Sequence, residues 1–373
     1  MIKKENLTQK VAKTIRNEFL SAREVNHGEF LPAERELAER FNVSRVTIRL
    51  SLKQLVNNGI LEVVPQKGYR FIKSAFSQNI TSIAYIVDSV KPGEPLDQIS
   101  EQIMTAINRI LMQRNQRMLS IGIKGISPDV AFFNKLKESN VQGILLDCNL
   151  PEVIKAVCKC NLPCVLINTF SENNNLDVVI QGNFNGTYKA VQYLISKNHR
   201  NIVWLGPQKG NVHYRERFSG ARAAMENANL NFSGNFKSEY DNNIEAETKE
   251  TEEFVTRSLK LKSPPTAFVC MWIPLAHSAI NSIQKTKLKL GKNIEIIGWC
   301  TETEYRESFI PRFINETIPA MMIWSPNEMA SVAIETLERR IKAPESPFVR
   351  IEVSARLQEP QSANKALNSK NLI

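Results

Sequence analysis

The sequence predicts a small α+β domain at the N-terminus, followed by a larger α/β body with parallel sheets. Residues 8–72 contain three short helical patterns and then two strand-like runs. Beyond residue 80, apolar strand-like runs alternate with helical patterns. Regular alternation of strands and helices is typical of parallel sheets with helical crossovers. The units are too many for one sheet, so we expect two lobes in the body.

Three helices are expected in the N-terminal domain, at Thr8–Leu20, at Glu34–Phe41 and from just after Ser44 to about Asn57. In the first, apolar residues recur every four positions, as they do on the buried face of a helix. Pro32 precedes the second helix at a position that a helix start tolerates. Ser44 can cap the third helix, because its hydroxyl accepts a hydrogen bond from a free backbone N–H group.

Residues 60–72 read as two short strands whose turn lies at Pro65–Gly68. Together with the helices they predict a winged helix-turn-helix, which places its last helix in the DNA major groove. Residues 1–79 hold 14 Lys and Arg against 8 Asp and Glu, whereas the rest of the chain holds 34 against 30. This excess of positive charge favours a polyanion as the partner of the N-terminal domain.

The third helix carries residue types that read DNA. Arg45 and Arg49 stand four residues apart, hence on one edge of the helix, and arginine can donate two hydrogen bonds to guanine. The alternative is a winged helix that contacts only protein, and the positive charge favours DNA over it. The predicted DNA contacts are Arg35, Ser44, Arg45, Thr47, Arg49 and, at the tip of the wing, Lys67 and Gly68.

Residues 8–72 resemble the winged-helix domain of the GntR family of regulators. The resemblance lies in LPAERELAERFNVSRVTIRLSLKQLVNNGIL at residues 31–61 and in QKGYRF at residues 66–71. Members of that family read palindromic DNA operators as dimers. The resemblance therefore implies a homodimer on double-stranded DNA, and it assigns DNA contact to the same seven positions.

The body resembles the LacI and periplasmic-binding-protein type of sensor domain over residues 80–358. The resemblance is carried by GNFNGTYKAVQYLISKNHRNIVWLG at 182–206, RFSGARAAM at 217–225, PPTAFVC at 264–270 and NIEIIGW at 293–299. A GntR domain on such a body looks like the arabinose-repressor branch of the family. The resemblance implies a sugar-sensing domain whose ligand lies between two lobes.

These patterns predict the domain boundaries. The DNA-binding domain is expected at 1–73, a linker at 74–80, the effector-binding domain at 81–360 and a polar tail at 361–373. Within the effector domain, the first lobe is expected at about 81–181 and 323–342. The second lobe is expected at about 182–322 and 347–358, with a single final strand at Phe348–Leu357.

Polar residues that follow predicted strands are the candidate effector contacts, because ligands of such folds lie at the carboxyl ends of strands. Arg217 stands at the family's ligand-binding arginine position, and its donors could hold vicinal hydroxyls or an anionic group. A plain helix start or an ion pair with Glu216 is the alternative. Asn168, Asp147 and Asp88 each follow a predicted strand and complete the polar candidates.

The chain departs from the family pattern at two positions of the expected pocket. Trp272-Ile273 replaces an Asn-Asp pair, and Trp299-Cys300 stands where an Asp is usual. Trp272 could stack on a sugar ring or a planar ligand, or it could plug the cleft. Two outcomes remain open, an altered effector specificity and a loss of sensing.

The six cysteines do not form a zinc pattern. Cys158, Cys160 and Cys164 have the spacing C-x-C-x-x-x-C, without a second pair or a nearby His. We expect them to be buried structural residues, and we predict neither a metal nor another cofactor. No phosphate-binding glycine loop, G-x-S-x-G elbow or H-E-x-x-H motif occurs, so an enzyme is not expected.

Residues 1–20 interleave charged and apolar residues without a secretory signal, and no apolar run reaches membrane-spanning length. We expect a cytoplasmic protein without membrane contact. The combined prediction is a DNA-binding transcriptional regulator, a repressor, that responds to a sugar or sugar-like molecule. The alternatives are a solute-binding protein of a transport system, which the missing export signal opposes, and a regulator that has lost ligand binding.

Overall fold

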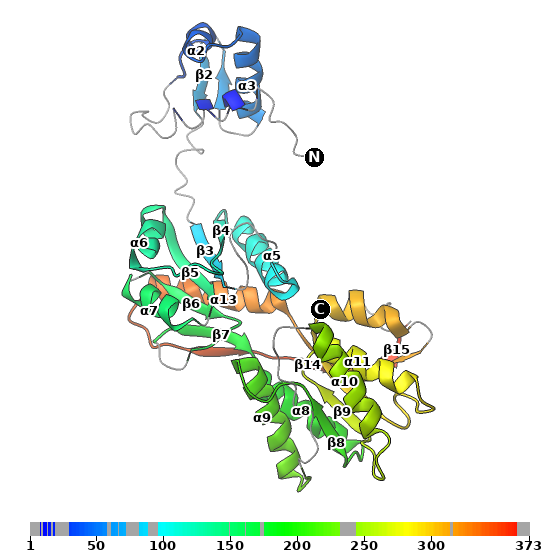
Figure 1. Cartoon of the computed structure of the whole chain (residues 1–373). Coiled ribbons are helices and arrows are strands. Elements are labelled where there is room, and N and C mark those ends of the chain that lie inside the picture. The colour runs from blue at the N-terminus through cyan, green and yellow to red at the C-terminus, as the bar shows by residue number, and fades with distance from the viewer. Residues whose placement is uncertain are drawn as a thin grey trace. The chain divides into compact units, whose positions relative to one another are not determined.

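A computed structural model divides the chain into two compact units, Met1–Thr81 and Ser82–Ile373 (Figure 1). Seven of the thirteen residues of the predicted first helix are described, and all seven are helical, whereas the predicted linker lies entirely outside the described residues. The described residues are 8, 10–12, 14–15, 18, 30–57, 61–65, 67–71, 82–88, 96–148, 150–160, 162–171, 175–231, 244–313 and 316–363. Within them, no helix is long and apolar enough to cross a bilayer.

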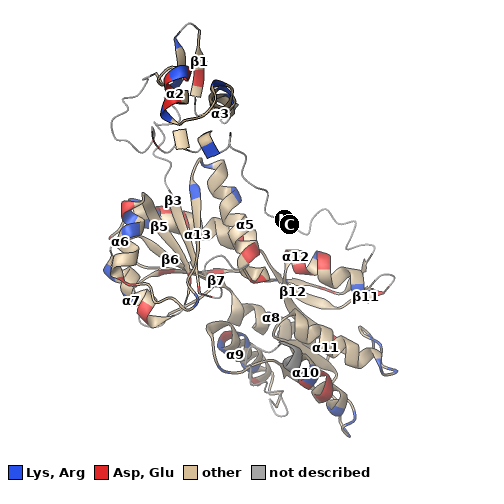
Figure 2. Ribbon diagram, turned by 45° about the horizontal axis from the view of Figure 1, so that its top comes forward, with Lys and Arg blue, Asp and Glu red and all other residues tan. Residues whose placement is uncertain are grey.

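The first unit contains the predicted helix-turn-helix and wing. Helices α2 (Glu34–Arg40) and α3 (Arg45–Asn57) are followed by strands β1 (Leu61–Val64) and β2 (Gly68–Phe71), which pair antiparallel. The core between these elements includes Leu37, Ile48 and Leu52, which are fully buried. Charged residues of both signs lie along α2 (Figure 2). The fold prediction for this part of the chain is confirmed.

The first sheet of the second unit is wholly parallel, with six strands in the order β13-β7-β6-β5-β3-β4. Helices α5 and α13 pack on one face, and α6 and α7 pack on the other. The strands are β3 (Ser82–Val87), β4 (Arg117–Gly122), β5 (Val141–Asp147), β6 (Cys164–Ile167), β7 (Asp177–Gln181) and β13 (Arg350–Val353). The helices are α5 (Gln98–Gln113), α6 (Val130–Glu138), α7 (Pro151–Lys159) and α13 (Pro326–Lys342).

The second sheet has five strands in the order β14-β12-β10-β9-β8, with only β14 antiparallel. Helices α8 and α9 cover one face, and α10 and α11 cover the other. The strands are β8 (Ile202–Leu205), β9 (Ala267–Cys270), β10 (Glu295–Thr301), β12 (Ala320–Trp324) and β14 (Arg356–Gln358). The helices are α8 (Asn183–Ser196), α9 (Val212–Asn227), α10 (Ile244–Ser258) and α11 (Ile273–Gln284).

Short elements complete the second lobe. A three-residue helix α12 (Glu302–Glu304) follows β10 directly, and two further turns of helix occupy Tyr305–Phe313. Strands β11 (Thr317–Ile318) and β15 (Gln361–Ser362) pair antiparallel, so the predicted polar tail begins with a paired strand. Its last described residue, Ala363, is buried.

The prediction for the final strand is wrong. Residues 348–357 do not form one strand of the second lobe, because β13 pairs parallel with β7 in the first sheet and β14 pairs antiparallel with β12 in the second. The apolar alternation continues through the crossing, so the pattern contains no break. The two halves of this segment pair with the edges of two different sheets. Only this tertiary pairing, and not the sequence pattern, divides the segment into two strands.

Strand β12 is absent from the predicted series, although it lies inside the second sheet. Its sequence AMMIW contains Ala and Met, which favour helices, and one β-branched residue. Pairing with β10 on one side and β14 on the other holds it extended. All five of its residues are buried, so packing overrides the local preference.

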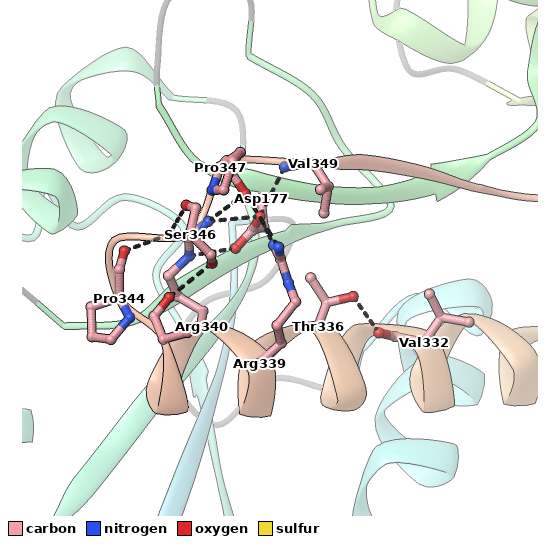
Figure 3. Close-up of polar contacts among 10 residues, drawn as sticks. Asp177, Val332, Thr336, Arg339, Arg340, Pro344, Ser346, Pro347 and Val349 are labelled. Carbon is pink, nitrogen blue, oxygen red and sulfur yellow. Dashed lines mark hydrogen bonds and ion pairs between the residues drawn. The ribbon is translucent and has the colours of Figure 1, made fainter.

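A buried ion pair fixes the C-terminal end of α13 to the start of β7 (Figure 3). Arg340 donates to both carboxylate oxygens of Asp177, at 2.7 and 3.1 Å. It also donates to backbone carbonyls of the loop that follows, including Pro344 and Ser346, and its guanidinium lies over Phe348. Asp177 in turn accepts from the backbone N–H of Val349 at 3.0 Å. The network thereby sets where β13 joins the sheet.

Candidate functional sites

The N-terminal end of α3 presents the predicted DNA-reading residues. The Ser44 hydroxyl accepts from the backbone N–H of Thr47 at 3.0 Å and lies 2.8 Å from the Thr47 hydroxyl. Ser44 therefore caps the helix, as predicted. Arg45 follows at the first helical position and is exposed. A guanidinium at this end of a helix is placed to enter a DNA groove.

Arg49 is exposed but paired. Its guanidinium donates to both carboxylate oxygens of Glu34 on α2, at 2.9 and 3.2 Å. The Tyr69 hydroxyl of the wing lies 3.5 Å from the same carboxylate. The hydrogen bond from Arg49 lowers the pKa of Glu34, against the opposing effect of partial burial. Side chains of α2, α3 and the wing thus meet at the carboxylate of Glu34. The sequence prediction did not include Glu34.

The remaining predicted DNA contacts lie at the surface. Arg35 is exposed and pairs with Glu39 at 3.2 Å. Lys67 is exposed, and Gly68 has a φ of +101° with open space where a side chain would stand. Glycine is needed at Gly68 because of this backbone angle rather than because of a close neighbour.

Two apolar side chains of α3 also face outward and were not predicted. Val46 is 66% exposed and Leu50 is 51% exposed, four residues apart on the helix. Apolar side chains on a recognition helix can contact the methyl group of thymine. Helical spacing places positions 46 and 50 on the side of α3 opposite the buried Ile48 and Leu52, so the sequence did contain a signal for their exposure.

The second unit contains a cavity of about 310 Å³ at the carboxyl ends of strands from both sheets. The first sheet contributes Asn168, after β6, and Gln181, the last residue of β7. The second lobe contributes residues of α9, of the turn after β9 and of the end of β10. They include His213, Tyr214, Arg217, Trp272, Trp299, Glu304 and Trp324. Three of the four tryptophans of the chain therefore line this one cavity.

A larger hollow of about 800 Å³ lies elsewhere in the second lobe, along residues 288–292 and at Ser362. It is away from the carboxyl ends of the parallel strands, where ligands of such sheets bind. We therefore assign the site to the smaller, tryptophan-lined cavity.

Arg217 lies in the cavity wall, but its guanidinium already donates hydrogen bonds to acceptors of the chain itself. It is 5% exposed, and it donates to Asn183 Oδ1 at 2.9 Å, the Met271 carbonyl at 2.7 Å and Gln181 Oε1 at 2.6 Å. Its guanidinium lies 4.0 Å from the centre of the Trp299 ring. Burial lowers the pKa of Arg217 to about 9, so the side chain remains a cation at neutral pH.

Trp272 stands at the start of α11, and its ring meets the edge of Tyr214 at 5.5 Å between ring centres. It is half-buried, whereas Trp299 and Trp324 are buried. The Trp299 ring fills the space beside Gly186, where a Cβ atom would approach it to 2.6 Å. Trp299 thus forms the floor of the cavity, and Trp272 forms a partly open wall.

Arg217 is not the only titratable side chain of the cavity wall whose pKa is shifted. His213 Nε2 lies 2.8 Å from the Asn168 carbonyl, and burial lowers the pKa of His213 to about 4. Burial raises the pKa of Glu304, whose carboxylate accepts from the backbone N–H of Thr301 at 2.8 Å. The spacing T-x-x-E of Thr301 and Glu304 is a helix capping signature, so this pair was readable from the sequence.

The cavity brings together only part of the predicted effector set. Arg217, Asn168 and Trp272 line it, whereas Asp147 and Asp88 are not among its lining residues. Asp147 instead accepts a hydrogen bond from the Tyr85 hydroxyl at 3.1 Å, beside Asp88 at the ends of β5 and β3. Following a strand places a residue at the right edge of a sheet, but it does not set the direction of its side chain.

Of the three cysteines that were expected to be buried, Cys160 and Cys164 are buried, and the expectation is wrong for Cys158. Cys148, Cys160, Cys164, Cys270 and Cys300 are buried free thiols, and Cys158 is exposed. Among the residues that the structure describes, no cluster of His, Cys, Asp and Glu is arranged to hold a metal ion.

Residues 7–71 match the family model described as bacterial regulatory proteins of the gntR family. Residues 191–363 match the model described as a periplasmic binding protein-like domain. The two matches fall on the winged helix-turn-helix and on the C-terminal half of the two-lobed unit.

Curated relatives include two proteins named HTH-type transcriptional repressor PurR. The one from Aliivibrio fischeri strain MJ11 is 28% identical over 215 residues, and the one from Aliivibrio salmonicida is 29% identical over the same length. In both cases the match covers 57% of this chain and 61% of the relative. The chain therefore spans less than two thirds of the relatives that it matches.

Solved structures of similar fold include a LacI-family regulatory protein from Chloroflexus aggregans, with a TM-score of 0.62 and 21% identity. That match covers 74% of this chain and 96% of the other. A lac repressor dimer, bound to operator and anti-inducer, has a TM-score of 0.61 and 15% identity, with 78% and 96% covered. A LacI-family regulator from Enterococcus faecium with bound ribose has a TM-score of 0.57 and 16% identity, with 76% and 98% covered. These likenesses confirm the two-lobed fold.

Proposed function

We propose that the chain is a transcriptional repressor controlled by a small molecule. It joins a GntR-type DNA-binding domain to a periplasmic-binding-protein-like domain. The observation that carries the proposal is the first turn of α3. Its capped N-terminus presents the exposed Arg45, and Glu34 holds Arg49 one turn further on. Relatives named as transcriptional repressors support the same function rather than an enzyme.

The proposed partners are an operator of double-stranded DNA and a second copy of the chain. A homodimer on a palindromic operator follows from the GntR resemblance, and one similar structure is a lac repressor dimer bound to operator. Cytoplasmic location, the compartment of the DNA, belongs to the same proposal.

The proposed effector is a sugar or sugar-like molecule in the tryptophan-lined cavity. Aromatic side chains stack on the apolar face of sugar rings, and Trp272 and Tyr214 form such a wall. Asn168 supplies an amide for hydroxyl groups. A similar regulator holds ribose.

A second candidate is a repressor that no longer senses a ligand. The observation that favours it is Arg217, because three of its N–H groups already donate to acceptors of the chain. Ligand binding would stabilise the folded chain, whereas an insensitive regulator would show no shift with any compound.

The test begins with in vitro selection of oligonucleotides by the full chain, followed by anisotropy titrations with the selected site. We expect at least about a thousandfold preference over random duplex, as specific regulators show. A panel of neutral sugars, sugar phosphates and nucleosides is then screened by thermal shift and by effect on operator affinity. Absence of any sequence preference, even at low salt, would contradict the proposal.

A further inference from the structure

The first crossing of the chain between its two sheets is made by Gln181, Gly182 and Asn183. Gln181 ends β7 and Asn183 begins α8. Both polar side chains are buried, with exposed fractions of 4% and 0%. Buried amides need hydrogen-bond partners. Those of Gln181 lie in the cavity wall, as do His213 and Arg217, two of the partners of Asn183.

The amide of Gln181 joins three parts of that wall. Its Oε1 accepts from Arg217 at 2.6 Å and from the indole N–H of Trp299 at 2.9 Å. Its Nε2 donates to Asn168 Oδ1 at 2.9 Å. A carbonyl oxygen has two acceptor sites, so the oxygen of Gln181 is fully used.

Arg217 also contacts Asn183, the residue at the other end of the same crossing. Its Nε donates to Asn183 Oδ1 at 2.9 Å, so one guanidinium contacts the residues before and after Gly182. The Trp299 ring covers the guanidinium at 4.0 Å and leaves no room for a Cβ at Gly186, in the first turn of α8. The cavity floor and the crossing are therefore one packed assembly.

We propose that Gln181 is a positioning residue that couples the cavity to the crossing between the lobes. A ligand oxygen that takes a hydrogen bond from Arg217 or Trp299 competes with Gln181 Oε1, and thereby acts on the segment that joins the two sheets. Ligand binding changes a conformational equilibrium only through contacts that differ between the states. These shared donors supply such a difference. The coupling to ligand rests on the proposed sensing function.

The first test is Gln181→Met, which has similar length but neither accepts nor donates. Charge-assisted hydrogen bonds to the buried Arg217 are among the stronger ones. We expect amides of residues 182–186 to exchange hydrogen about tenfold faster in the variant. We also expect a changed emission from Trp299, isolated by subtracting the spectrum of the matching Trp299→Phe protein. Unchanged exchange and unchanged emission would overturn the proposal.

The second test is rescue by Gln181→Glu, which keeps an acceptor oxygen opposite Arg217 and Trp299. Exchange at residues 182–186 and the Trp299 emission should return to the wild-type values. A Gln181→Glu protein that behaves like Gln181→Met would show that the acceptor is not the acting group. If Gln181→Met does not fold, Gln181→Glu alone decides, because wild-type emission supports the acceptor role and altered emission contradicts it.

The matched control is Gln102→Met, the same change at a half-buried glutamine of α5 outside the cavity. Its effect on residues 182–186 should be absent, and an equal effect would count against a specific role of Gln181. These measurements need neither operator nor effector. Failure of the wild-type chain to select DNA would therefore remove the repressor proposal without changing their outcome.

Discussion

Glu34 on α2 interacts with both arginines of α3 that are predicted to read DNA. It pairs with Arg49, and the nearby charge of Arg45 also lowers the pKa of its carboxyl group. A carboxylate in this position reduces the net positive charge of the surface while it orients one guanidinium. Orientation of this kind affects base discrimination more than total affinity, because affinity comes mainly from phosphate contacts.

Glu34→Gln should therefore weaken sequence discrimination while raising affinity for random duplex. Removing the anion leaves Arg49 without its charged partner, and it adds one positive charge to the surface. Affinities for the selected operator and for random DNA would be measured across salt concentrations. Glu36→Gln is the matched control, since it makes the same charge change on the exposed side of α2. Equal specificity ratios in the two variants would contradict the positioning role of Glu34.

Asp147 is a second residue whose pKa is shifted by its surroundings. Burial raises its pKa to about 8, with a further contribution from the carboxylate of Asp88. In the unfolded chain the pKa of an aspartate carboxyl group is about 4. Between these values the folded state retains a proton that the unfolded state has released. The contribution of Asp147 to stability is thus present below about pH 4 and is lost as the pH rises towards about 8.

Asp147→Asn should raise the thermal midpoint at pH 8 and leave it nearly unchanged at pH 4.5. The amide is always neutral and can still accept from the Tyr85 hydroxyl, which lies 3.1 Å from the native carboxylate. Thermal unfolding followed by circular dichroism at the two pH values measures the difference. A stabilisation that is the same at both pH values would show that ionisation of Asp147 is not its cause.

At the scale of elements, α13 is held to β7 by two neighbouring arginines with different surroundings. Arg340 is 6% exposed and makes a two-pronged pair with the fully buried Asp177. Arg339 donates to the same carboxylate at 2.6 Å but is 36% exposed. Removing Arg340 takes both of its hydrogen bonds from the buried Asp177 and leaves that carboxylate with the more exposed Arg339 as its remaining charged partner. Loss of a buried partner costs more stability than loss of one that water partly screens.

Arg340→Met should destabilise the second unit by about 3–5 kcal/mol. Arg339→Met, its neighbour on the same helix with the same partner, should cost about 1 kcal/mol or less. Urea unfolding of the full chain, followed by far-ultraviolet circular dichroism, compares the two variants. Similar losses from both would mean that burial of Arg340 does not set the strength of this contact.

The alternation of strands and helices predicted most elements of the body, and two of its errors concern strands of the second sheet. β12 was missed because Ala and Met favour helix, and the final strand was not divided because its apolar pattern has no break. Both errors have one physical origin. The local apolar pattern indicates which residues are buried. It does not indicate which sheet edge a strand joins, because that depends on strands far away in the sequence.

At the scale of the whole molecule, DNA reading and ligand sensing are assigned to separate compact units. Arg45 belongs to the first unit, and Trp272 belongs to the second. Because the two units have their own cores, a surface substitution in one should leave the other folded. The two proposed functions should therefore be separable by mutation, although the proposed repressor mechanism couples them in the intact chain.

Arg45→Ala should weaken operator binding by about 1–3 kcal/mol while leaving effector binding intact. Trp272→Ala should do the reverse, with normal operator affinity without effector and no response to the effector found in the screen. Anisotropy titrations with and without that compound give both quantities for each variant. Loss of operator affinity in Trp272→Ala without effector would show that the tryptophan acts on the fold rather than on the ligand.

The residue types and spacing in the chain were enough to predict the winged helix-turn-helix, its capped third helix and the two-lobed α/β body. These features depend on short-range periodicity, capping and charge, which are written along the sequence. Tertiary structure decided which charges meet. It paired Arg49 with Glu34, engaged Arg217 with Gln181 and Asn183, and turned Asp147 towards Tyr85. Side-chain direction and burial arise from packing between distant segments, and no local pattern encodes them.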